Sequence, residues 1–151
     1  MVDHILYATD KNYCELCAVS LYSLLSHLKG EVVIHIIESS LEERKDDLIR
    51  IADEFNCKID FIPIEDISRR LVEANIPPYR GGYSPYARFF ISDYVSEGRG
   101  LYLDCDTIIK GDVSSILNYD LKGSPLGAII DQSTSLVNVL IGHKKEDMYL
   151  R

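Results

Sequence analysis

Two kinds of apolar pattern alternate along this chain. Short, nearly continuous apolar runs predict strands over residues 4–9, 32–37, 58–62, 101–109 and 126–131. Apolar positions spaced three or four residues apart predict helices over residues 13–28, 40–55, 64–75 and 84–95, and a short helix after residue 112. Strands that alternate with helices are typical of α/β proteins. We therefore expect a Rossmann-like, mainly parallel sheet flanked by helices, with its ligand site at the carboxyl ends of the strands.

Local signals mark the ends of several predicted helices. Ser40 and Glu43 have the spacing of a capping box, and Asp112 stands where an N-cap residue is expected. Pro85 follows Ser84 at the first position of its helix, where proline is tolerated. Residues 76–82 contain two prolines and two glycines, so we expect a loop there that can act as a lid.

Two aspartates interrupt the fourth apolar run. Alternation along a strand puts Asp104 and Asp106 on the same side. Because burying an unpaired carboxylate costs several kcal/mol, these side chains need a partner. Carboxylate oxygens suit Mg²⁺ or Mn²⁺, and these ions keep open positions for phosphates. The pair therefore predicts a metal-held diphosphate. The alternative is that Asp106 caps a turn while Asp104 lies at the rim of the sheet.

A second polar cluster ends the first predicted strand, where residues 8–12 read Ala-Thr-Asp-Lys-Asn. If the first and fourth strands are neighbours in the sheet, this cluster meets Asp104 and Asp106 at one edge. The chain contains neither GxGxxG nor GxxxxGK[ST]. Dinucleotide binding of the Rossmann type and P-loop phosphate binding are therefore disfavoured.

Composition narrows the class of protein further. The chain has 151 residues, of which 46% are hydrophobic and 26% charged, enough for one globular domain. Its net charge of −8 argues against a nucleic-acid partner. We expect a cytoplasmic protein, with action at a membrane face left open, because we find neither a leader nor a membrane-spanning run. The four cysteines are expected to be reduced, and Cys14-x-x-Cys17 lacks the second pair of a zinc site.

The motifs, in their order and spacing, resemble the N-terminal half of glycosyltransferase family 8, including its general stress protein A-like members. The matching segments are YATDKNY (7–13), AVSLYSLL (18–25), YSPYARFF (83–90), LYLDCDTII (101–109) and GDVSSIL (111–117). The resemblance implies a GT-A fold that binds UDP-glucose or UDP-galactose with Mn²⁺ or Mg²⁺. It also implies retaining hexosyl transfer to a carbohydrate or lipid-linked acceptor, such as lipopolysaccharide.

The resemblance assigns roles to single residues. Asp104 and Asp106 would bind the metal, and no catalytic nucleophile can be nominated. The donor-binding residues would be Ala8 on the ribose, Asp10 and Asn12 on the uracil edge, Tyr13 stacked on the base, Arg88 at the sugar and diphosphate, and Asp131 at the sugar. Each has a structural alternative, since turns favour Asp and Asn, a tyrosine can fill a core, and an arginine can pair with a surface acid.

Later motifs of the family are missing from this chain. We find neither its FN(S/A)G-type strand nor its HxxGxxKPW motif, whose histidine completes the metal site, and His143 does not match that histidine. We therefore expect residues 1–151 to be the N-terminal part of a single GT-A domain that is inactive alone. Exposed edges should also favour a homo-oligomer that covers residues 126–130 and the strand bearing Asp104.

Two other functions remain open. An aspartate pair followed by threonine, as at Thr107, also occurs in haloacid-dehalogenase phosphatases, although there it follows the first strand and a glycine precedes the threonine. A non-catalytic nucleotide-sugar-binding or assembly module is the other alternative, because part of the expected site is absent.

Overall fold

The computed structural model of this chain describes residues 2–79 and 81–128. The chain divides into two compact units, Met1–Asn118 and Tyr119–Arg151. In the first unit, strands alternate with helices as the apolar pattern predicted. In the described part of the second, residues 119–128, the Lys122 amide donates to the Asp120 carboxylate and the Ser124 amide to the Leu121 carbonyl. None of the described helices is long and apolar enough to cross a membrane.

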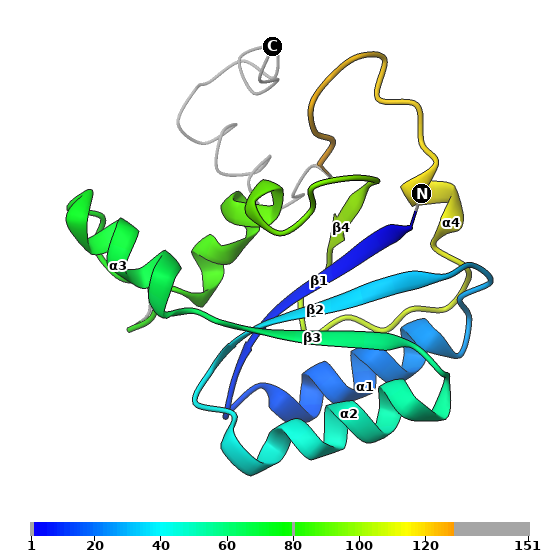
Figure 1. Cartoon of the computed structure of the whole chain (residues 1–151), viewed down its shortest axis with the longest axis horizontal. Helices are drawn as coiled ribbons and strands as arrows, with labels where there is room; N and C mark the ends of the chain where they lie inside the picture. Colours follow the sequence, from blue (N-terminus) through cyan, green and yellow to red (C-terminus); the bar gives the residue numbers. More distant parts are fainter. Residues whose placement is uncertain (1, 80, 129–151) are drawn as a thin grey trace, which may run out of the picture. The chain divides into compact units, whose positions relative to one another are not determined.

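A parallel sheet of four strands forms the centre of the first unit (Figure 1). The strands are β1 (Asp3–Asp10), β2 (Val32–Ser39), β3 (Lys58–Pro63) and β4 (Gly100–Tyr102), and they lie in the order β3-β2-β1-β4. The chain thus adds β2 and β3 on one side of β1, and then returns to add β4 on the other side. The carboxyl end of β1 therefore lies at the point where the strand order reverses, which is the usual ligand site of such sheets.

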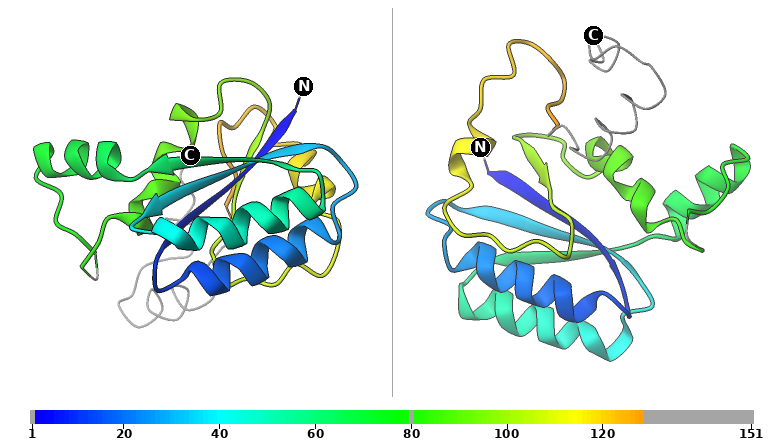
Figure 2. Two further views of the ribbon diagram at one scale, coloured as in Figure 1. Left: turned by 60° about the horizontal axis from the view of Figure 1, so that its bottom comes forward. Right: turned by 180° about the vertical axis from the view of Figure 1, so that it is seen from behind.

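Helices α1 (Cys14–Leu25) and α2 (Lys45–Glu54) lie side by side on one face of the sheet (Figure 2). The alternating residues of the strands that point to this face, such as Ile5, Tyr7, Ile34 and Ile36, are fully buried in one apolar cluster with Leu21 and other residues of both helices. The short helix α4 (Ser114–Leu117) adds Leu117 to the same cluster. The predicted parallel sheet with flanking helices is therefore confirmed.

Helix α3 (Glu65–Glu73) and the 3₁₀ helix η2 (Ser84–Asp93) bury a second, smaller cluster against the opposite face of the sheet. It contains Ile37 of β2, Ile67 and Leu71 of α3, and Ala87 of η2. The helix predicted over residues 84–95 is present, although it is not an α-helix. Residues 84–93 form the tighter 3₁₀ helix, with a break at Phe90, where the dihedral angles leave the helical region.

Three local predictions were wrong. Ser40 and Glu43 form no capping box, because Ser40 adopts a positive φ of 56° and the Leu41 amide instead donates to the Glu38 carboxylate at the end of β2. A 3₁₀ turn, η1 (Glu42–Arg44), then leads into α2. The expected strand over 101–109 ends at Tyr102, since residues 104–107 turn away from the sheet. The N-cap position of α4 is held by Val113 rather than by the expected Asp112, whose carboxylate accepts from the Ser114 amide at 3.2 Å.

Candidate nucleotide and metal site

The end of β1 meets the aspartate segment directly. The Leu103 amide donates to the Leu6 carbonyl at 3.0 Å and continues the pairing of β4 with β1. Two residues further on, the Cys105 thiol donates to the Ala8 carbonyl, also at 3.0 Å. The two polar clusters therefore lie together at the edge where the strand order reverses, as expected if β1 and β4 are neighbours.

Asp104 and Asp106 project from a turn that follows β4 rather than from the strand itself. Both the amide and the hydroxyl of Thr107 donate to the Asp104 carbonyl, at 3.3 and 2.7 Å, and close the turn. Cys105 points inward with 7% of its surface exposed, while the aspartates on either side of it are exposed. The carboxylates are therefore not buried, as a strand would have placed them, and that they face one side stays a prediction.

Arg88 of η2 reaches the same turn. Its guanidinium donates to the Asp104 carboxylate at 2.8 Å and to the Pro85 carbonyl at 3.1 Å. The same group lies 4.9 Å from the centre of the Tyr102 ring, where a cation is attracted to the ring face. Burial raises the pKa of Tyr102 to about 12, although Arg88 opposes the shift. A cation therefore stands beside the aspartates, in the region to which the resemblance assigned Arg88.

The loop after β1 is ordered by its own aspartate. One oxygen of Asp10 accepts from the amides of Asn12 and Tyr13, at 2.8 and 3.1 Å, so Asp10 forms the turn that starts α1. Asn12 is exposed, and half of the Tyr13 surface, 51%, is exposed as well. Tyr13 is therefore not a core residue, and its ring is accessible to a planar ligand such as a base.

The donor atoms at the turn match the preferences of a hard divalent cation. The carboxylates of Asp104 and Asp106 supply the oxygen ligands that Mg²⁺ and Mn²⁺ bind. Within residues 2–79 and 81–128, no group of three or more His, Cys, Asp or Glu side chains is arranged to hold a metal. The two carboxylates thus fit such an ion in chemical type, and that they bind one stays a prediction.

The sequence reading missed the groups that fasten the aspartate turn. Cys105 and Thr107 bond to the backbone from inside the turn, and Ser20 of α1 contacts Thr107. Hydrogen bonds from the Cys17 thiol and, to a smaller degree, the Thr9 side chain lower the pKa of Cys105 against the effect of burial. The available signal was a buried hydroxyl in the apolar stripe of α1, which requires a polar partner.

The predicted lid loop is held in place at several points. The backbones of Tyr79 and Gly82 exchange two hydrogen bonds around Gly81, which has a positive φ of 85°. The hydroxyls of Tyr83 and Tyr86 donate to the carbonyls of Ile76 and Pro77 and tie the loop to η2. Asp131, His143 and the second half of the strand expected over 126–131 lie outside the described residues, and residues 126–128 are not in a strand.

Comparison with known families gives one match over nearly the whole chain. Residues 4–148 match the profile of glycosyl transferase family 8. The glycosyltransferase GlyF of Streptococcus pneumoniae serotype 4 is 30% identical over 128 residues, which make up 84% of this chain and 31% of that protein. The lipopolysaccharide 1,3-galactosyltransferase of Salmonella typhimurium is 27% identical over 132 residues, or 84% of this chain and 38% of that protein.

Solved structures have the same fold. The galactosyltransferase LgtC in complex with donor and acceptor sugar analogs superposes with a TM-score of 0.68 at 24% identity, covering 87% of this chain and 48% of LgtC. The Q189E mutant of LgtC gives a TM-score of 0.66 at 25% identity. The expected GT-A fold is therefore confirmed. This chain spans less than half the length of each of these proteins.

Proposed function

This chain belongs to glycosyl transferase family 8, and from that premise we propose that it is the nucleotide-sugar-binding part of a metal-dependent hexosyltransferase. The observation that carries the proposal is the contact between the β1 end and the aspartate turn, made by the Cys105 thiol and the Ala8 carbonyl. Through that contact and the pair of Arg88 with Asp104, the aspartate turn, the loop after β1 and the Arg88 cation lie at one edge of the sheet, which supports a site for a metal-bound nucleotide.

In this proposal, different residues of the chain bind different parts of the nucleotide-sugar donor. Asp104 and Asp106 hold the divalent ion, and Arg88 bonds the diphosphate and the sugar next to it. The backbone of Ala8 contacts the ribose, Asn12 and the second oxygen of Asp10 bond the edge of uracil, and Tyr13 stacks on its face. Asp131 approaches the donor sugar. When bound, Mn²⁺ or Mg²⁺ supplies Lewis-acid stabilisation of the departing diphosphate.

Names of the relatives support the class of substrate. The Salmonella typhimurium relative is a galactosyltransferase that acts on lipopolysaccharide, and LgtC binds donor and acceptor sugar analogs. We therefore propose UDP-galactose or UDP-glucose as the donor, a carbohydrate or lipid-linked acceptor, and retention of anomeric configuration. The partners are thus small molecules and glycans, together with a second copy of this chain.

Isothermal titration of the chain with UDP, with and without Mn²⁺, tests the binding proposal. We expect Mn²⁺ to strengthen UDP binding, and Asp104→Asn and Asp106→Asn to remove that gain because each deletes a charged ligand. Asp53→Asn, a change at an exposed carboxylate of α2, is the matched control and should bind like the parent. Mn²⁺-dependent UDP binding that survives both turn variants would contradict the metal assignment.

A second titration tests how the base is recognised. UDP should bind more tightly than ADP, and Asn12→Ala should reduce this preference because it removes an amide that can bond uracil. Equal binding of UDP and ADP by the parent would rule out base reading by this loop.

Product analysis separates this function from its alternatives. Release of UDP from a UDP-hexose indicates a transferase, phosphate from a phosphomonoester indicates a phosphatase, and binding without either product indicates a binding module. Since electrostatic catalysis needs its whole constellation in place, we expect UDP binding by this chain but negligible sugar transfer. Robust sugar transfer by residues 1–151 would contradict the proposal that these residues bind the donor but do not carry the whole catalytic site.

A further inference from the structure

A chain of hydroxyl groups runs from the core of the sheet to the aspartate turn. The Tyr7 hydroxyl of β1 lies 3.1 Å from the Ser20 hydroxyl of α1, and both residues are fully buried. The Ser20 hydroxyl lies 3.1 Å from that of Thr107, which in turn bonds the Asp104 carbonyl at 2.7 Å. The chain thus links residues that are far apart in sequence to the backbone of one aspartate of the proposed metal site.

The Asp104 carbonyl, at the end of this series of hydroxyl groups, sets the direction of every hydrogen bond in the series. A carbonyl oxygen can only accept, so the single proton of the Thr107 hydroxyl is used on the Asp104 carbonyl. Thr107 must then accept from Ser20, and Ser20 must accept from Tyr7. Donation therefore runs from Tyr7 to Ser20 to Thr107 to Asp104, and each hydroxyl between the two ends both donates and accepts.

Helix α1 holds the aspartate segment at a second point. The Ile109 amide donates to the Ser23 hydroxyl at 2.9 Å, and that hydroxyl donates to the Ser20 carbonyl at 2.8 Å. Thus α1 fastens the turn on the side of residues 107–109, while β1 fastens it through Cys105. Asp106 lies between these attachments and Asp104 directly precedes the one at Cys105, so the separation of the two carboxylates depends on both.

We propose that Ser20 and Thr107 are positioning residues, which set the backbone of Asp104 and thereby the geometry that Asp104 and Asp106 offer to a metal-bound diphosphate. This role rests on the proposed function of the turn. The buried Ser20 hydroxyl has its hydrogen-bond partners in Tyr7 and Thr107. Without such partners, a hydroxyl on the apolar face of a helix would be costly to bury. Groups that orient metal ligands are in general nearly as important for affinity as the ligands.

Titration of Mn²⁺-dependent UDP binding tests this role with variants of Thr107. Thr107→Val keeps the shape of the side chain but removes its hydroxyl, and it should weaken binding on the order of 10-fold, as loss of outer-shell partners does. Thr107→Ser keeps the hydroxyl and should retain most of the affinity. Ser20→Ala should weaken binding less than Thr107→Val does, because Thr107 keeps its bond to the Asp104 carbonyl but loses the donor that orients its hydroxyl.

Tyr7→Phe is the matched control. It removes the first donor of the chain, but Ser20 can still donate to Thr107 and Thr107 to Asp104. The variant should lose thermal stability, because a buried bond is lost, and yet bind UDP with Mn²⁺ as the parent does. A purely structural role would instead reduce binding in Tyr7→Phe and Thr107→Val in proportion to their lost stability, and that result would overturn the proposal.

Amide hydrogen exchange over residues 103–109 gives a readout that needs neither metal nor nucleotide. Exchange should rise in Thr107→Val and stay at the parent level in Tyr7→Phe. If Asp104→Asn abolishes Mn²⁺-dependent UDP binding while Thr107→Val leaves it unchanged, the positioning role fails alone. If neither variant changes UDP binding, or the parent binds neither Mn²⁺ nor UDP, the proposed function fails and the positioning role fails with it.

Discussion

The guanidinium of Arg88 occupies an oxygen of Asp104 that the proposed metal site also needs. Both side chains are about half exposed, at 43% and 52%, so their attraction is screened by solvent. An exposed pair of this kind contributes on the order of 0.2–1 kcal/mol, which is small enough for a divalent ion to overcome. Under the proposed function, Arg88 leaves Asp104 and bonds the diphosphate when the donor binds.

Arg88→Gln should consequently have opposite effects on two ligands. Without nucleotide, Mn²⁺ should bind about 2- to 5-fold more tightly, because the variant removes a competing cation worth up to about 1 kcal/mol. Binding of UDP-galactose with Mn²⁺ should weaken, because the charge-assisted bonds to the diphosphate are lost. Titration with each ligand checks both signs, with Arg50→Gln on the exposed side of α2 as control. A loss of affinity for both ligands would contradict the exchange of partners.

Strand β4 approaches η2 so closely that only a glycine fits between them. A Cβ on Gly100 would lie 2.9 Å from Cγ2 of Ile91 and 3.1 Å from Cγ2 of Val95. It would also lie 3.3 Å from Cδ1 of Leu6 in β1. The two Cγ2 methyls belong to β-branched side chains, which are stiff and cannot rotate aside easily.

Gly100→Ala should therefore reduce the free energy of unfolding by about 1–3 kcal/mol, the usual cost of overpacking. Gly30→Ala is the matched control, since a Cβ there meets no heavy atom within 4 Å, and it should be neutral. Urea denaturation of the three proteins measures the difference. Equal midpoints for Gly100→Ala and the parent would show that η2 moves aside at no cost.

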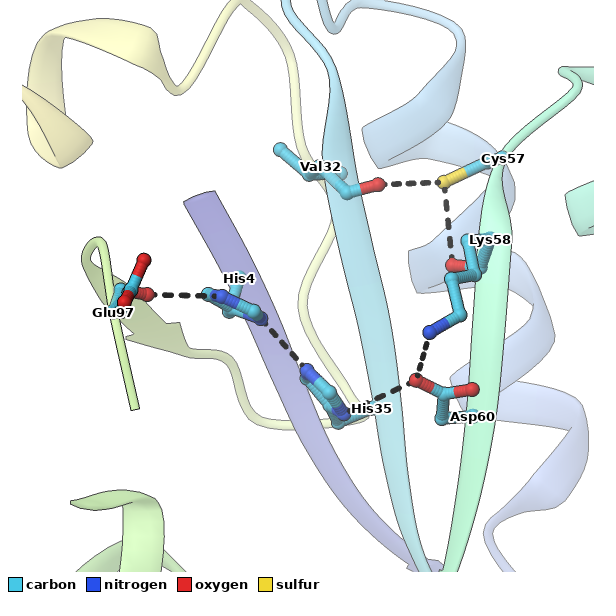
Figure 3. A network of polar contacts seen from close by, with 7 residues as sticks. All are labelled: His4, Val32, His35, Cys57, Lys58, Asp60 and Glu97. Atoms are coloured by element: carbon cyan, nitrogen blue, oxygen red, sulfur yellow. Dashed lines mark hydrogen bonds and ion pairs between the residues drawn. The ribbon is translucent and has the colours of Figure 1, made fainter. Parts of the chain in front are cut away.

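A polar ladder made by His4, His35 and Asp60 crosses three neighbouring strands of the sheet (Figure 3). It lies on the same face of the sheet as α3 and η2, toward the amino-terminal ends of the strands. His4 of β1 bonds the Glu97 carbonyl through Nε2 at 3.1 Å and His35 of β2 through Nδ1 at 2.8 Å. Because the carbonyl only accepts, neutral His4 donates from Nε2 and accepts from His35. Asp60 of β3 lies 3.9 Å from the other nitrogen of His35 and pairs with Lys58 at 3.1 Å.

The ladder makes stability depend on pH through His35. Burial lowers the pKa of His35, the His4 ring and Lys58 lower it further, and Asp60 opposes the shift. The unfolded chain therefore binds more protons once the pH falls below the ordinary histidine value of about 6.5. Stability that is fully present above this pH is lost as the pH falls through the lowered pKa.

His35→Gln should flatten the fall of Tm between pH 7 and pH 5, because glutamine offers a donor and an acceptor without titrating. His27→Gln changes an exposed histidine that bonds the Ser23 carbonyl, and it should keep the slope of the parent. Thermal melts of the parent and the two variants between pH 7 and pH 5 measure how Tm depends on pH in each protein. Parallel curves for His35→Gln and the parent would assign the acid sensitivity to other groups.

Considered as one body, the first unit has a strand edge that no described strand covers, because β4 pairs with β1 alone. Such edges favour pairing with another chain. We expect the mass measured by light scattering to rise from monomer toward dimer as the protein is concentrated. Val19→Lys places a charge on the exposed apolar stripe of α1 and should leave this rise unchanged. A monomer mass at every concentration would contradict self-association, and loss of the dimer in Val19→Lys would assign it to α1.

Local pattern was sufficient for most of the strands and helices. Strands β1, β2 and β3 agree with their predicted ranges within about two residues, because continuous apolar runs bounded by turn residues leave few alternatives. The roles of Asp104 and Asp106 stay predictions, because the structure shows where these two carboxylates lie and not what they bind. What Asp10, Asn12 and Tyr13 bind stays a prediction.

Only the tertiary structure decided how the site is held. Ser40 lost its capping role to Glu38, because the backbone at the end of β2 brings that carboxylate to the Leu41 amide. The aspartates leave a turn rather than a strand, because Thr107 closes the backbone on Asp104. Ser20 and Thr107 are 87 positions apart, and no spacing rule connects them. Their bond exists because β4 pairs with β1, and the turn that follows β4 then lies against α1. The buried Ser20 hydroxyl needs a partner, and the fold supplies Thr107.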